Sequence, residues 1–134
     1  MKYWNDLDGS IFFNKVFTTK IQIGSISLYS LRIDNDRPEI TFGFDIDELP
    51  DTPPEKWKKT EFNTCRLGLN CGSPTDLTIK NIPTTEKLYL TIENHSDYYL
   101  IRAKSEHSLI EFKTKWPLLC GPTVYLNDPD SAYY

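Results

Sequence analysis

The stretch I-T-F-G-F-D-I-D-E-L-P-D-T-P-P-E-K-W, residues 40–57, joins a β-strand pattern to an acidic, proline-rich segment. Successive side chains of a strand point to opposite faces, so Ile40, Phe42 and Phe44 share one face. The residues between them are polar or small and share the other face. This alternation predicts a strand from Glu39 to Asp47 that buries one face in a core and exposes the other.

Seven further segments show strand patterns, with turn residues between them at intervals of about ten residues. They cover residues 20–34, with a break expected near Gly24, and 63–71, 76–81, 87–94, 98–104, 108–113 and 123–126. Residues 3–13 predict a short N-terminal helix, although Gly9 and the β-favouring residues after it obscure the helix end. The predicted fold class is mainly β (β-rich α+β), an antiparallel sheet or sandwich of about seven to eight strands with a proline-rich crossover.

The crossover spans Leu49 to Lys59, where three prolines remove backbone donors and rule out a central strand. Asp51 or Thr52 could cap one helical turn that begins at the two adjacent prolines. Such a turn would carry Trp57 inward, so we expect the crossover to pack this ring onto the sheet.

A chain of 134 residues suits one domain, and it could bury about two-thirds of its unfolded surface. We expect a single domain over residues 1–134, with 1–19 as an N-terminal segment and 127–134 as a flexible tail. No apolar run approaches the roughly 18 residues of a spanning helix, and the first residues do not resemble a secretory signal. The expected compartment is the cytoplasm.

The acidic residues are concentrated in one part of the chain. Residues 34–55 hold eight acids against one base, Arg37, which gives this segment a local charge of −7. The whole chain carries −4, so the remaining residues sum to +3. This asymmetry indicates a charged partner more than a catalytic site. A pI near 5.1 argues against nucleic acid as that partner, because an acidic surface repels phosphates.

Residue types suited to catalysis or metal binding are few. Cys65, Cys71 and Cys120 make an odd number without zinc-binding spacing, and we expect structural thiols. His95 and His107 fall in predicted turns, where a solvated side chain is the common case. We predict no metal site and no cofactor.

Two other functions remain open. Asp45 and Asp47 would lie on one strand face about 7 Å apart, a separation that also suits the paired carboxylates of a small hydrolase. The tryptophans and tyrosines could instead form the stacking platform of a carbohydrate-binding β-sandwich. We favour a core position for Trp57 and Trp116, which would remove two members of that platform.

The order of these features resembles the immunity protein 50 family of bacterial polymorphic toxin systems. The resemblance covers residues 25–94. It rests on S-L-R-I-D-N-D-R-P-E-I-T-F-G-F-D-I, then on L-P-D-T-P-P-E-K-W with its P-P-x-x-W crossover, and on the strands C-R-L-G-L-N-C and D-L-T-I-K-N. Pro50, Pro54 and Trp57 match the crossover, and Leu77 and Ile79 match a following strand. Three cysteines and extra lysines beside the tryptophan depart from the family pattern, which leaves the recognised toxin open.

The resemblance implies a binding protein and not an enzyme, made beside a secreted toxin and neutralising it by direct stoichiometric contact. The implied partner is the cognate toxin domain, with no nucleic acid and no membrane, and a homodimer through an edge strand is a further option. No residue is assigned a catalytic role. The acidic surface supplies the toxin-binding candidates, which are Asp34, Asp36, Asp45, Asp47, Glu48, Asp51 and Glu55.

Overall fold

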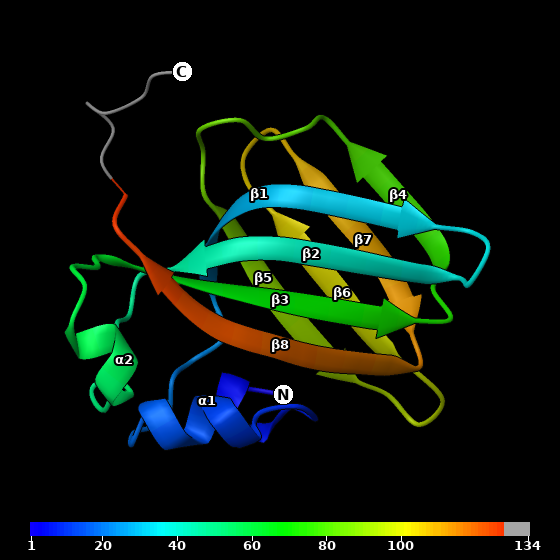
Figure 1. Cartoon of the computed structure of the whole chain (residues 1–134). Helices are drawn as coiled ribbons and strands as arrows, with labels where there is room; N and C mark the ends of the chain where they lie inside the picture. Colours follow the sequence, from blue (N-terminus) through cyan, green and yellow to red (C-terminus); the bar gives the residue numbers. More distant parts are fainter. Residues whose placement is uncertain (128–134) are drawn as a thin grey trace.

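The computed structural model describes residues 1–127 and shows eight strands in one antiparallel sheet, with few and short helices (Figure 1). The predicted fold class is confirmed. The predicted tail lies outside the described residues from 128 onward. The strands are β1 (Ser25–Asp34), β2 (Glu39–Ile46), β3 (Thr64–Gly72), β4 (Thr75–Lys80), β5 (Leu88–Asn94), β6 (Tyr99–Lys104), β7 (Leu109–Thr114) and β8 (Trp116–Tyr125).

The sheet folds over on itself at β1. Its strand order is β4-β7-β6-β5-β1-β2-β3-β8. β1 pairs with β2 along most of its length but with β5 only at Ser25 and Ile26, so the sheet bends there. The two halves then cross face to face (Figure 1), and the ring of Phe42 on β2 meets that of Phe112 on β7 edge-on at 5.8 Å. The core lies between the halves.

The alternation of the opening stretch appears directly in the burial of β2 and β3. Phe42 and Phe44 face inward opposite Leu69 and Leu67 of β3, and all four side chains are buried. The thiols of Cys65 and Cys71 lie on the same inner face and are free. Burial, with smaller contributions from Asp45 and Glu48, raises the pKa of Cys65 to about 12. These two cysteines are structural thiols, as predicted.

The N-terminal segment forms two short helices instead of the single one predicted. They are η1 (Trp4–Asp6) and α1 (Ile11–Val16), and α1 lies along the β8 side of the sheet (Figure 1). Gly9 interrupts them with φ of 86°, and a Cβ there would lie 2.3 Å from the carbonyl oxygen of Leu119. Because only glycine fits this close approach, the helix cannot run through residue 9.

β8 is much longer than the predicted strand over 123–126. β8 contains Pro117 and Pro122, which it accommodates because it is the last strand of the sheet, where proline is tolerated. The prediction that Trp116 is core is wrong, because its side chain is 64 % exposed. Trp116 pairs with Gly72 at an outward-facing position of the ladder.

The crossover contains the predicted helical turn as α2 (Glu55–Lys58), which Pro54 precedes without a side-chain cap. The predicted cap is wrong, because Asp51 accepts hydrogen bonds from the backbone N–H and the hydroxyl of Thr18. Trp57 is half-buried against the core, and its ring meets Phe12 of α1 edge-on at 5.6 Å. The crossover is therefore held against α1. No helix in residues 1–127 is long and apolar enough to cross a membrane.

Candidate functional site

The two halves of the sheet each have an outward surface. We call the outer side of β1, β2, β3 and β8 the front face, since it faces the viewer in Figure 1, and the outer side of β4, β5, β6 and β7 the back face. Gly43 and Gly68 lie opposite each other at the centre of the front face. They leave a shallow hollow of about 450 Å³ over the middle of the sheet. Its lining includes Ser30, Thr41, Asn70 and Cys120.

A network of four side chains borders this hollow. The guanidinium of Arg66 lies between the rings of Tyr29 and Tyr125, 3.8 Å and 4.4 Å from their centroids. Its Nε donates to Asp45 Oδ1 at 2.9 Å, and the Tyr125 hydroxyl donates to Asp45 Oδ2 at 2.6 Å. Arg66 Nη2 also donates to the Tyr125 oxygen at 2.9 Å. The guanidinium is therefore held by stacking and by hydrogen bonds together.

The protonation states of the network follow from its contacts. Burial alone would lower the pKa of Arg66, but the hydrogen bond and negative charge of Asp45 outweigh this effect and raise it. Burial raises the pKa of Tyr125, and the hydrogen bond to Asp45 raises it further. Tyr125 therefore stays a neutral donor, and the charges of Arg66 and Asp45 balance each other.

Two exposed aromatic side chains lie on glycines of neighbouring strands. The register between β1 and β2 shifts after Leu28, and this bulge places the ring of Tyr29 across Gly43, where a Cβ would lie 2.6 Å from the ring. The ring of Trp116 lies across Gly72 in the same way, with 3.1 Å to an added Cβ. Tyr29 is 55 % exposed. Each ring is supported on one side by backbone and accessible to solvent.

The back face also pairs its charges across neighbouring strands, but its arginine is shared between two carboxylates instead of being stacked between two rings. Arg102 on β6 donates to Glu111 on β7 at 2.5 Å and lies 3.6 Å from Glu93 on β5. Lys113 pairs with Asp76 at 3.2 Å, and the hydrogen bond to this carboxylate raises the pKa of Lys113.

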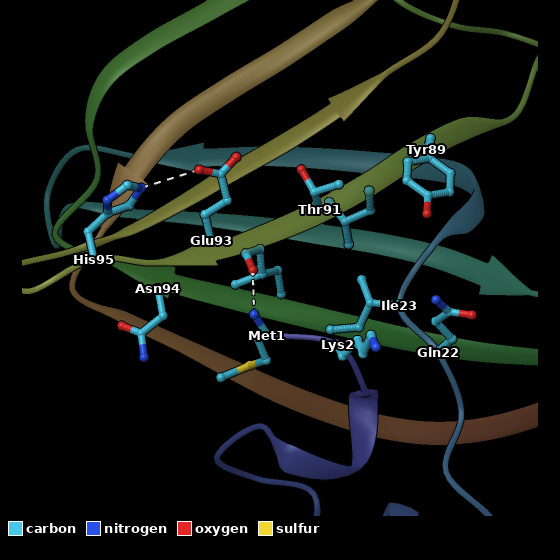
Figure 2. Close-up of a pocket in the computed structure, with 11 residues that line it drawn as sticks. Met1, Lys2, Gln22, Ile23, Tyr89, Thr91, Glu93, Asn94 and His95 are labelled. Carbon is cyan, nitrogen blue, oxygen red and sulfur yellow. Dashed lines mark hydrogen bonds and ion pairs between the residues drawn. The ribbon is translucent and has the colours of Figure 1, made fainter.

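A second hollow of about 520 Å³ opens where β5 meets the N-terminal residues (Figure 2). Glu93 and His95 approach each other at its margin, with 3.3 Å between Oε1 and Nε2. The imidazole stacks on Tyr98 at 4.6 Å. Glu93 also forms an ion pair with Arg102, so its carboxylate already has partners on the back face.

The structure divides the predicted acidic surface into two groups at opposite ends of β2. Asp34 and Asp36 lie at the β1–β2 hairpin, where Glu39 completes the lining of a cleft of about 320 Å³ with two arginines. The crossover group follows the other end of β2 and consists of Asp47, Glu48, Asp51 and Glu55. A strand of this length separates the groups by about 25 Å. Asp45 lies in the network on the front face and belongs to neither group.

Half of the acids in the −7 segment are paired with cations from outside it. The pairs are Asp34 with Arg32 at 3.0 Å, Asp45 with Arg66 at 2.9 Å, Asp47 with Lys87 at 2.6 Å and Glu55 with Lys58 at 3.0 Å. Hydrogen bonds from Thr52 and Thr18 lower the pKa of Asp51. Within residues 1–127, Asp36, Glu39 and Glu48 make no ion pair. The surface is therefore less negative than the sequence segment.

The family comparison decides what kind of protein this is. The model of the family described as Immunity protein 50 matches residues 9–125. The chain belongs to the Immunity protein 50 family. The search of curated proteins and the search of solved structures gave no significant match. The family match extends well beyond residues 25–94 and includes the whole front face.

The matched crossover of this immunity protein has a structural role in the fold. Pro50 is buried, and Pro54 immediately precedes α2. The N–H of Thr52 donates to the carbonyl of Val16 at 3.0 Å, which joins the crossover to α1 beside the contact between Trp57 and Phe12. The P-P-x-x-W motif therefore fixes the path of the chain from β2 to β3.

The hydrolase alternative finds no support in the positions of its two carboxylates. Asp45 is held by Arg66 and Tyr125, while Asp47 lies beyond the end of β2 against Lys87. In the described part of the chain, no three His, Cys, Asp or Glu side chains come together as a metal site would require. The absence of a cofactor stays a prediction.

Sequence reasoning missed the main members of the front face. Arg66 could have been found, because it alternates outward from the buried positions of C-R-L-G-L-N-C. Tyr29 could not, because a bulge and not simple alternation places it. Trp116 was misassigned because large aromatic residues are usually well buried.

Proposed function

We propose that this immunity protein neutralises a bacterial toxin by binding it directly, one chain to one toxin domain, inside the cytoplasm. It acts by contact and not by catalysis. The observation that carries the proposal is the family match over residues 9–125, which includes both the crossover and the front face. An acidic surface helps this role, because opposite charges raise the association rate of two proteins by roughly 10- to 1,000-fold.

The acids that suit long-range attraction best are those without a cation beside them. Asp36 at the hairpin and Glu48 at the crossover are exposed and make no ion pair within residues 1–127. The other candidates from the sequence, Asp34, Asp45, Asp47, Asp51 and Glu55, are held by neighbouring side chains. We propose that Asp36 and Glu48 attract the toxin and that the held acids contribute less.

Charge reversal tests this assignment with the toxin domain encoded beside the gene of this chain. The variant Asp36→Lys with Glu48→Lys should slow association about tenfold or more at low salt and flatten its salt dependence. The matched control is Asp97→Lys with Glu106→Lys, two exposed acids in the turns after β5 and β6. Both double variants raise the net charge by four, so only the position of the change differs.

Stopped-flow association rates at several salt concentrations give the result. Unchanged association of the Asp36 and Glu48 variant at low salt contradicts the acidic surface. A wild-type chain that neither binds nor inhibits the toxin domain contradicts direct neutralisation itself.

A carbohydrate-binding module remains a second candidate because of one observation, the exposed rings of Tyr29 and Trp116 on the front face. Flat aromatic side chains of this kind can stack on sugars. Tryptophan fluorescence titrated with oligosaccharides tests it, and a chain without Trp116 shows which ring responds. No change in emission with any sugar counts against this function.

A homodimer formed by pairing of edge strands is a separate proposal. β4 ends one side of the sheet, and no strand within residues 1–127 pairs with the second edge of β1 beyond Ile26. Either edge could accept a strand from a second copy. Sedimentation at several protein concentrations tests it, and a constant monomer mass contradicts it.

A further inference from the structure

We propose that the toxin docks on the front face and that Tyr29 and Trp116 are its two anchoring side chains, an inference that rests on the proposed function. The occupant of the hollow is an uncharged, protruding side chain of the toxin domain. Tyr29 then borders the neutral centre of the binding surface, Trp116 lies on β8 toward the β1–β2 hairpin, and acidic groups lie at the margins.

The first support is the chemistry of the exposed side chains. The residues that dominate the energy of protein interfaces are most often tryptophan, tyrosine and arginine near the centre of the contact. The front face presents Trp116 at 64 % exposure, Tyr29 at 55 % exposure and Arg66 beneath the Tyr29 ring. The rings are held on glycine backbone, so little conformational freedom remains to be lost on binding.

The second support is the charge balance around the hollow. Its two lining arginines are already paired, Arg66 with Asp45 at 2.9 Å and Arg32 with Asp34 at 3.0 Å. A cation entering the hollow would meet these guanidinium groups, and an anion would compete with the carboxylates that hold them. An uncharged side chain fits such a site, and the glycine floor lets it approach the backbone closely.

The third support is the size of the surface. Four strands about 4.8 Å apart and about 30 Å long present on the order of 600 Å². One partner of a stable protein complex typically buries about 800 Å². The front face with its hairpin margin therefore approaches the size that a protein partner requires, which is larger than a single sugar or small ligand covers.

The back face supplies a matched control. Tyr89 on β5 is 53 % exposed and faces outward, and its ring lies 3.3 Å from a Cβ added at Gly24. It therefore shares exposure, residue type and a glycine neighbour with Tyr29. Only its place, on the back face, differs.

The test measures how tightly this chain binds the purified toxin domain that is encoded beside its gene. Tyr29→Ala and Trp116→Ala should each weaken binding about thirtyfold, mainly through faster dissociation, while Tyr89→Ala should stay within about twofold. Asn70→Phe, which fills the hollow, should also weaken binding, and Thr91→Phe in the other hollow should not. Thermal unfolding of each variant shows that the fold is kept.

Each outcome decides the matter. If the wild-type chain binds the toxin and both Tyr29→Ala and Trp116→Ala bind it equally well, the proposed docking surface is wrong. Direct neutralisation is not contradicted by that result. Equal losses for Tyr29→Ala and Tyr89→Ala also overturn it. A wild-type chain that does not bind the toxin overturns the proposed function, and the docking surface with it. If the fluorescence of Trp116 changes when sugars are added or when the chain self-associates, but not when the toxin is added, the toxin is not the occupant of the front face.

Discussion

The two outer faces of this folded sheet use the same kinds of residues in opposite ways. On the front face, Arg66 is stacked between two tyrosines and hydrogen-bonded to Asp45, and the exposed aromatic rings rest on glycines. On the back face, Arg102 is shared between Glu93 and Glu111 on neighbouring strands. The two arginines are almost equally exposed, at 33 % and 34 % of their side chains. Pairing geometry, and not exposure, therefore distinguishes these two arginine sites.

The largest stability effect should come from removing the two arginines in turn. Arg66→Ala leaves Asp45, which is only 17 % exposed, without its cation, and should lower the free energy of unfolding by about 2 kcal/mol. Arg102→Ala leaves more exposed carboxylates and should cost about 1 kcal/mol or less. Urea unfolding of both variants measures the difference. If Arg66→Ala costs no more than Arg102→Ala, the two faces do not differ in this way.

A smaller effect should appear in alkaline solution. The pKa of Tyr125 on the front face is raised above 10.0 and that of Lys113 on the back face above 10.5. A raised pKa means that the folded chain holds the proton more tightly than the unfolded chain. The contribution of each group to the free energy of unfolding is therefore fully present below its ordinary pKa and is lost as pH rises through its pKa in the folded chain. Unfolding free energy should therefore fall above about pH 10.

Two variants separate these contributions. Tyr125→Phe should flatten the alkaline loss more than Lys113→Met, because Lys113 is exposed and its ion pair is screened by salt. The comparison uses the free energy of unfolding in urea of the wild-type chain and both variants, measured from neutral to alkaline pH at two salt concentrations. An equal effect of the two variants would show that the front network is no more sheltered than the back pair.

The sequence was sufficient for the parts of the fold that follow from local alternation. The inward positions of β2 and β3, the turn at α2 and the free buried thiols all follow from residue spacing and type. It was insufficient where a distant contact decides the structure. Gly9 separates two short helices because its backbone lies against Leu119, and β8 accepts Pro117 because it lies at the sheet edge.

The candidate site was less predictable for the same reason. The acids of one segment appear as a single surface in the sequence, but β2 separates them in the structure. Four of them are paired with cations from β1, α2, β3 and the residue before β5. Tyr29 reaches the front face through a bulge, which alternation does not reveal. Family membership could be predicted because its motif lies in one continuous stretch of chain.

The central claim, that the front face is the surface covered by the toxin, can be tested at Cys120. This thiol lines the front hollow and is half-buried, whereas Cys65 and Cys71 are fully buried and serve as internal controls. The measurement is the rate at which a small alkylating reagent modifies Cys120, read by mass spectrometry in the chain alone and in a verified one-to-one complex with the toxin domain. We expect the toxin to slow this modification about tenfold or more, because solvent is excluded from the centre of an interface. An unchanged rate in the complex would contradict it.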